Sequence, residues 1–127
     1  ERILYIDDEP ALASLAEKIL GGLGYEVTTV TSSLEALENF KAKPGQFDLV
    51  ITDMTMPGMT GDKLAQKLME IRPDIPVILC SGYSEHISAE KAESLGIRKF
   101  IMKPIQKKTM AETIKEVLGA SSHRFQA

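Results

Sequence analysis

Five short apolar segments rich in β-branched residues alternate with stretches of helical periodicity, and this alternation constrains the fold more than any other feature. The apolar segments span residues 3–6, 25–30, 48–52, 75–80 and 99–102. The first, third and fourth are almost continuously apolar, as is typical of strands covered on both faces, whereas 25–30 alternates and suits an edge strand. Strand and helix alternating five times predict a parallel α/β sheet with helices on both faces.

The first two helical stretches have clear apolar patterns. In the first, residues at helical spacing predict one inward-facing stripe: Leu12, Leu15, Ala16, Ile19, Leu20 and Leu23. Pro10 lies in the first turn of this helix, where a missing N–H costs nothing. In the second, either Ser32 or Ser33 can cap the helix. Three of its residues are predicted to face inward: Leu34, Leu37 and Phe40.

The later helical stretches are less uniform. Leu64, Leu68 and Ile71 predict a third helix, and residues 84–95 hold so few inward apolar residues that we expect the weakest and most mobile helix there. The last helix is marked by Met110, Ile114, Val117 and Leu118. Residues 119–127 have little periodicity. We therefore expect one domain over 1–120 and a tail or linker over 121–127.

The alternation does not by itself give the order of the strands. Doubly wound sheets of the flavodoxin-like (βα)5 kind have the order 2-1-3-4-5, which we take as the expectation for this five-stranded sheet. Ligands of such sheets bind beyond the carboxyl ends of the strands, near the point where the winding reverses. The residues that follow each strand are therefore the candidates for a functional site.

Polar side chains stand at those positions. Asp7 and Asp8 follow the first segment, Asp53 ends the third, Ser81 follows the fourth and Lys103 follows the fifth. With the first and third strands adjacent, the three aspartates are expected to converge in one crevice. Carboxylates held so close repel one another and need protons or a cation.

This set of residues predicts phosphoryl transfer. An all-oxygen site suits Mg²⁺, which prefers one or two carboxylates together with a substrate phosphate. One aspartate would remain to attack phosphorus, since carboxylates are established covalent acceptors. Lys103 and the Ser81 hydroxyl can hold the remaining phosphoryl oxygens, the lysine as a point charge and the serine as a hydrogen-bond donor.

The motifs resemble those of the receiver domain of two-component response regulators, over roughly residues 2–118. The resemblance is carried by Asp7-Asp8, by the run from Asp53 through Met56-Pro57 to Gly61, by Ser81-Gly82 and by Lys103-Pro104. It implies that Asp53 is the phosphoacceptor. Asp8 would be a direct metal ligand and Asp7 a ligand through water.

The resemblance assigns three further roles. The backbone carbonyl of Thr55 would complete the shell of Mg²⁺. Ser81, where threonine is more frequent, would supply the hydroxyl that moves toward the phosphoryl group. Phe100 stands where the family has a switch aromatic, often tyrosine, so switching there would work through packing alone.

The implied function is a signalling switch in a phosphorelay. The donor would be a phosphohistidine of a sensor histidine kinase or of a histidine phosphotransfer protein. The chain would catalyse only its own phosphorylation and dephosphorylation, and it would transmit a conformational change to an output domain that the chain does not contain. Glu1 rather than Met comes first, which favours an excised receiver or one from a hybrid kinase.

Other functions fit less well. Alone, Asp8 could cap a helix and Asp53 could belong to a turn. A phosphatase similar to haloacid dehalogenases usually has a second acid two residues after its nucleophile, where this chain has Thr55. A degenerate receiver would lack an acid or the lysine. Neither a Walker-type loop nor a dinucleotide glycine fingerprint is present.

Composition limits the classes of binding partner and the cellular compartments to be considered. A net charge of −3 argues against direct binding of nucleic acid. The single cysteine, Cys80, excludes an internal disulfide and fits a reducing compartment. No apolar run is long enough to insert into a membrane, so we expect a cytoplasmic protein. A homodimer stays open.

Overall fold

The computed structural model describes residues 1–81, 96–97, 99–102 and 106–126. The weak helix expected over 84–95 lies outside these residues, as does the motif Lys103-Pro104. Within the described residues, no helix is both long and apolar enough to cross a membrane.

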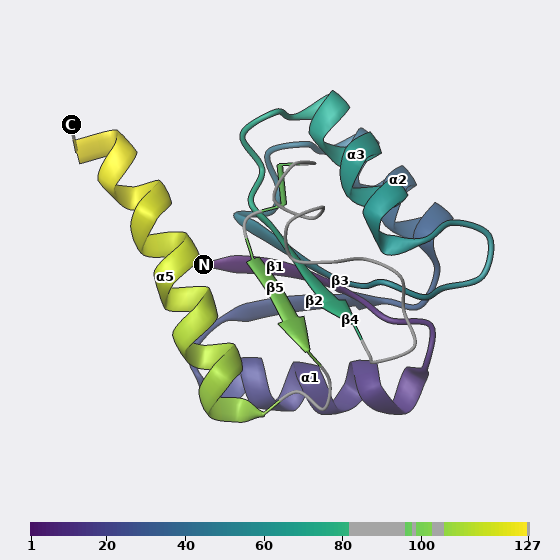
Figure 1. Ribbon diagram of the computed structural model, residues 1–127, viewed down its shortest axis with the longest axis horizontal. Helices are drawn as coiled ribbons and strands as arrows, with labels where there is room; N and C mark the ends of the chain where they lie inside the picture. Colours follow the sequence, from purple (N-terminus) through teal and green to yellow (C-terminus); the bar gives the residue numbers. More distant parts are fainter. Residues whose placement is uncertain (82–95, 98, 103–105, 127) are drawn as a thin grey trace.

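The sheet is parallel throughout and has the strand order β2-β1-β3-β4-β5, as expected for a flavodoxin-like α/β fold (Figure 1). Its strands are β1 Arg2–Ile6, β2 Glu26–Val30, β3 Leu49–Asp53, β4 Val77–Ser81 and β5 Lys99–Met102. Every residue of β3 and β4 is buried, whereas β2 alternates along the edge. Continuous apolar runs thus became central strands because both of their faces are covered.

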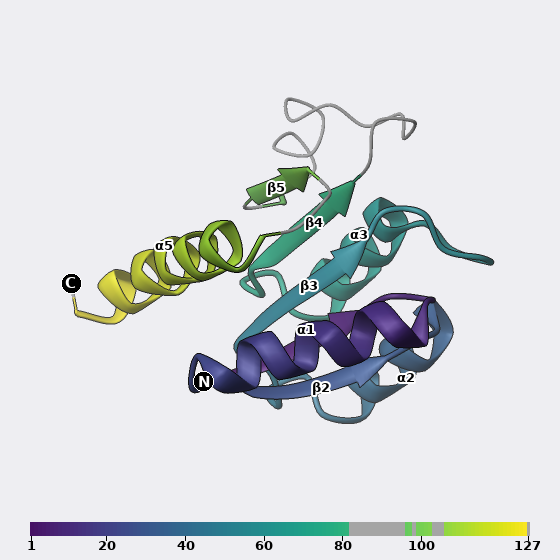
Figure 2. The same ribbon diagram turned by 90° about the horizontal axis from the view of Figure 1, so that it is seen from below.

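Four helices are described: α1 Pro10–Gly22, α2 Ser33–Ala42, α3 Gly61–Ile71 and α5 Lys107–Gln126. α2 and α3 cover one face of the sheet, and α1 and α5 cover the other (Figures 1 and 2). The first core includes Phe40 and Leu64, and the second includes Leu20 and Ile114, all fully buried. The chain reverses its winding between β1 and β3, so the carboxyl ends of these two strands form the crevice.

The inward stripe predicted for α1 is wrong in part. Leu12 and Leu15 are 40% and 54% exposed, and the buried residues of the helix are Ala13, Ala16 and Leu20. These three follow the i, i+3, i+7 spacing of one helical face. Small alanines let the helix approach the sheet closely, so the buried face is turned away from the larger leucines.

The same error affects α2. Leu34 is 62% exposed, while Ser33, Ala36 and Phe40 are buried and Leu37 is partly buried against the core. Ser32 is the capping residue, because its side chain accepts a hydrogen bond from the Glu35 N–H. The question of which serine caps the helix is thereby settled, and the hydroxyl of Ser33 makes a different contact.

Helix α5 runs to Gln126, although apolar periodicity stops at Leu118 and the residues after it were expected to form a tail. An established helix gains one hydrogen bond for each residue that it fixes. The end of an apolar pattern is therefore not by itself the end of a helix.

Candidate metal centre at the carboxyl ends of the strands

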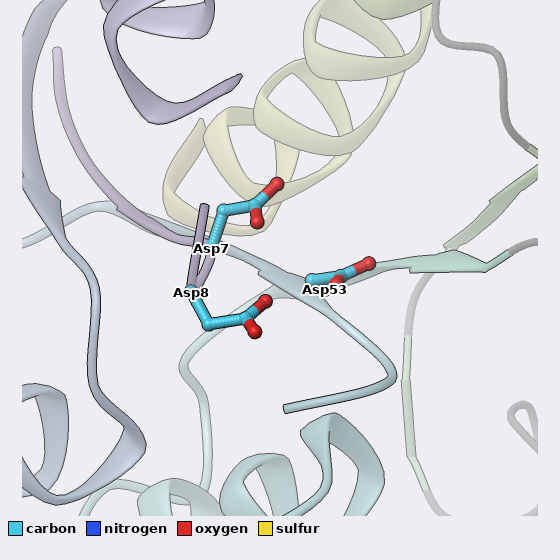
Figure 3. Close-up of side chains that lie close together, drawn as sticks. All are labelled: Asp7, Asp8 and Asp53. Atoms are coloured by element: carbon cyan, nitrogen blue, oxygen red, sulfur yellow. The ribbon is translucent and has the colours of Figure 1, made fainter. Parts of the chain in front are cut away.

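Three aspartates from two neighbouring strands come together at one edge of the sheet. Asp7 and Asp8 directly follow β1, and Asp53 is the last residue of β3. Ile6 pairs with Thr52, so Asp7 and Asp53 stand at the same level of the sheet. One carboxylate oxygen of each aspartate lies within 4.8 Å of the others, and Figure 3 shows the three side chains extending into one region. The convergence expected from the strand ends is thus present.

Burial makes this concentration of charge costly. Asp7 is 2% exposed and Asp53 is 5% exposed, and Asp8 is partly buried. Ionised carboxylates lose hydration when they are buried, and neighbouring negative charges add repulsion. The phenol of Tyr5 lies close to this negative charge. Burial raises the pKa of Tyr5, and the nearby acidic groups of Cys80, Asp7 and Asp53 raise it further. Tyr5 therefore stays protonated and adds no charge.

The donor set fits a hard divalent cation. All three groups offer oxygen, the ligand that Mg²⁺ prefers. Two direct Mg²⁺ ligands at about 2.1 Å from the ion can be at most about 4.2 Å apart. A spread of up to 4.8 Å therefore accommodates an ion that is held partly through water.

Local hydrogen bonds hold the segment that carries Asp7 and Asp8. The Asp7 N–H donates to the Val30 carbonyl at 3.2 Å, and an Asp7 carboxylate oxygen accepts from the Glu9 N–H at 3.0 Å. The N-cap residue of α1 is Glu9, whose side chain makes no capping hydrogen bond. Asp8 is therefore not the helix cap, and the plainest alternative explanation of this residue fails.

The segment 54–60, which we call the acceptor loop, leads from Asp53 to α3. Its base is closed by a hydrogen bond of 2.7 Å from the Gly61 N–H to the Met54 carbonyl. Gly58 within it has a φ of +81°, in the left-handed region that glycine adopts without strain. A Cβ at position 61 would lie 2.1 Å from the carbonyl oxygen of Asp53. Only glycine lets α3 begin so close to the end of β3.

This requirement for Gly61 was not predicted from the sequence. In the sequence, Gly61 is only one residue of a motif. Its role depends on the absence of a side chain, which lets two backbone segments come close together. A glycine at the expected start of a helix, where it lowers helix stability, was the available signal.

The remaining predicted site residues are placed less completely. Ser81 is fully buried at the end of β4, one residue beyond Cys80, the pairing partner of Asp53. Thr55 is exposed in the acceptor loop. Phe100 belongs to β5 and pairs with Leu79, while Lys103 lies outside the described residues.

Comparison with known proteins supplies the family. The model of the response regulator receiver domain matches residues 3–115, nearly the whole chain. The chain belongs to this family. Receiver domains are the phosphoacceptor switches of two-component response regulators, and the fold and the cluster of acids agree with that function.

Individual relatives differ in how much of their length the receiver occupies. The chain is 35% identical to the sensor kinase CckA of Brucella abortus over 91% of its own length, but it spans only 12% of that protein. It is 33% identical to the chemotaxis protein CheY of Treponema pallidum, covering 92% of this chain and 82% of the relative.

A solved structure shows the same architecture. The crystal structure of a response regulator receiver domain protein from Clostridium thermocellum superposes with a TM-score of 0.91 at 30% identity. The match covers 95% of this chain and 96% of that one. The phosphatase and nucleotide-binding alternatives are therefore set aside.

Proposed function

We propose that Asp53 is the phosphoacceptor of this receiver and that Mg²⁺ is its cofactor. The observation that carries the proposal is the meeting of three carboxylates from the ends of β1 and β3, with oxygens within 4.8 Å of one another. Asp53 is the member contributed by the central strand β3, with the acceptor loop directly behind it.

The reaction is a displacement at phosphorus. A carboxylate oxygen of Asp53 forms a bond to the phosphorus of a phosphohistidine, and the bond from phosphorus to the imidazole nitrogen breaks. The electron pair stays on that nitrogen, and the imidazole leaves neutral because its other nitrogen carries the proton. Asp7, Asp8, Asp53 and the Thr55 carbonyl would hold Mg²⁺. The bound ion would neutralise negative charge on the transferred phosphoryl group.

The remaining roles concern what happens after transfer. Lys103 would pair with the new phosphoryl charge, and the Ser81 hydroxyl would donate to a phosphoryl oxygen. Ser81 is buried, so its reorientation would be felt by neighbouring side chains. Phe100 on the adjacent strand β5 would respond through packing, and the complete (βα)5 domain would convert between two states.

The partners follow from the donor chemistry. A sensor histidine kinase or a histidine phosphotransfer protein would supply the phosphoryl group in the cytoplasm, and an output domain elsewhere would read the change. The name of the relative CckA, a sensor kinase of which the receiver is a small part, supports a parent of the hybrid-kinase kind. The receiver would occupy 1–120, with 121–127 as a tail or linker, and it would bind no nucleic acid itself.

The test is chemical labelling. Acetyl phosphate with Mg²⁺ is expected to phosphorylate the wild-type chain, and intact-mass spectrometry measures the fraction modified. Chelation of Mg²⁺, or the substitution Asp53→Asn, is expected to abolish the labelling. Asp48→Asn, which removes an aspartate at the other end of β3, is the matched control and should label normally.

Three results would reject the proposal. Label that survives chelation would exclude the metal, and label that survives Asp53→Asn would exclude the residue. Rapid turnover of many equivalents of donor without accumulation of labelled protein would indicate a hydrolase.

A further inference from the structure

Two adjacent serines at the start of α2 have different partners. The Ser32 side chain accepts a hydrogen bond from the Glu35 N–H at 3.4 Å and so caps its own helix. The Ser33 hydroxyl instead donates to the Met59 carbonyl at 2.8 Å, across 26 residues of sequence. Ser33 is 2% exposed. A buried hydroxyl used in this way joins α2 to the acceptor loop.

The contact fixes a defined part of that loop. Met59 lies between Gly58, where the backbone turns with a positive φ, and Thr60, the N-cap residue of α3. The loop is already closed at its base, where the Gly61 N–H donates to the Met54 carbonyl. The base hydrogen bond therefore joins the two ends of the loop, and Ser33 adds a second attachment at Met59, close to the start of α3.

Packing reinforces the hydrogen bond. The Ser33 hydroxyl also lies 3.8 Å from the sulfur of Met56, which is 6% exposed in the core beneath α2 and α3. Met59 is partly buried against the same core. Thr55, whose carbonyl is a proposed ligand of the cation, directly precedes Met56 and is exposed. Any shift of Met56 and Met59 would thus move the backbone of the acceptor loop, which begins directly after Asp53.

We propose that Ser33 is a positioning residue for the metal centre: its hydrogen bond to Met59 sets the acceptor loop so that the loop backbone can meet the cation bound at Asp53. The inference rests on the proposed function, because it assumes that Mg²⁺ binds at the aspartate cluster. Groups that orient metal ligands typically influence metal affinity by about 10- to 100-fold. Ser33 acts through the loop rather than on a ligand directly, so we expect about tenfold at most.

The matched pair of variants is Ser33→Ala and Ser32→Ala. Each removes one hydroxyl from the first turn of α2, and each is expected to lower the melting temperature by a few degrees. Only Ser33→Ala releases the acceptor loop. We expect Ser33→Ala to weaken Mg²⁺ binding by about three- to tenfold, and Ser32→Ala to leave it unchanged within about twofold.

Two measurements on the folded proteins distinguish a change in the position of the acceptor loop from a general loss of stability. Titration calorimetry with MgCl2 gives the affinity. Methyl NMR of methionine-labelled protein follows Met54, Met56 and Met59, whose signals should respond to Mg²⁺ as a group in the wild type and in Ser32→Ala. In Ser33→Ala the Met59 signal is expected to shift before Mg²⁺ is added. Ser33→Cys, which is close to serine in size but carries a much weaker hydrogen-bond donor, provides the second measurement if the alanine variant folds poorly.

Equal Mg²⁺ affinities for Ser33→Ala and Ser32→Ala would overturn the inference and leave the proposed function intact. A wild-type chain that neither binds Mg²⁺ nor accepts a phosphoryl group would instead reject the proposed function. The two failures are therefore distinguishable in one set of titrations.

Discussion

The two ends of the sheet carry aspartates in different surroundings. At the amino ends, Asp48 pairs with Arg2 at 3.5 Å and Asp74 pairs with Arg72 at 3.1 Å. At the carboxyl ends, Asp7, Asp8 and Asp53 gather with oxygens within 4.8 Å of one another. At the amino ends each of these two acids pairs with an arginine, whereas at the carboxyl ends three acids stand within reach of one another.

The Asp48–Arg2 pair contributes to the stability of the fold, whereas the aspartate cluster is the candidate functional site. Burial opposes ionisation of Asp48, but hydrogen bonds from the Arg2 amide and guanidinium and the charges nearby outweigh it, so that its pKa is lowered. Such a pair stabilises the folded state modestly. At the carboxyl ends, repulsion among the three carboxylates opposes folding, and a bound cation of the kind proposed above would offset that repulsion.

The largest expected effect concerns backbone approach at the carboxyl end. Gly61→Ala would place a Cβ 2.1 Å from the Asp53 carbonyl oxygen, so α3 or the end of β3 must move. We expect destabilisation of about 1–3 kcal/mol and phosphorylation slowed by about 100-fold, the order expected for a displacement near 1 Å. Urea denaturation and acetyl phosphate labelling measure the two effects.

Gly45→Ala is the matched change at the amino end. A Cβ there would have no atom within 4 Å, and the residue has no positive φ. We expect stability within about 0.5 kcal/mol of the wild type and normal labelling. If the two alanine variants behaved alike, the carboxyl end would not be the constrained one.

Removing one acid from each end should give opposite changes. Without divalent cations, Asp8→Asn relieves repulsion and is expected to leave the free energy of unfolding unchanged or to raise it by up to about 1 kcal/mol. Its Mg²⁺ affinity is expected to fall by about tenfold or more. Urea denaturation with and without Mg²⁺, together with calorimetry, provides the measurements.

Asp48→Asn should do the reverse. The pair with Arg2 is more than one-third exposed on both side chains, so solvent limits its contribution to about 1 kcal/mol or less. Stability is expected to fall by that amount while Mg²⁺ affinity stays at the wild-type value. A loss of stability in Asp8→Asn measured without metal would contradict the contrast between the two ends.

The smallest expected effect is a pH dependence. Because the pKa of Asp48 is lowered from 3.8, its contribution to stability is present above that value and is lost as the pH falls through the lower pKa of the folded state. The difference in unfolding free energy between wild type and Asp48→Asn should therefore be constant from neutral pH to about 4 and shrink below it. A difference that stays constant down to pH 2 would exclude the pair as its source.

Much of the fold was predictable because strand patterns depend on burial of both faces. The continuous runs that became β3 and β4 needed no knowledge of neighbours. Helix faces were harder, since Leu12, Leu15 and Leu34 were predicted to be inside and are exposed. By hydrophobicity, a large aliphatic residue such as leucine is expected inside before alanine. Close approach of a helix to a sheet instead favours small residues such as Ala13 and Ala16.

The sequence by itself determined which chemical groups stand at the strand ends, because a strand ends where its apolar run ends. That placed Asp7, Asp8 and Asp53 beside one another once the order of the strands was assumed. Only the tertiary structure decided which contacts hold the acceptor loop, namely the close approach at Gly61 and the hydrogen bond from Ser33 to Met59. Gly61 meets the end of β3 across the acceptor loop, which sequence patterns do not describe, whereas Ser33 and Met59 are 26 residues apart and meet only because α2 and α3 pack together.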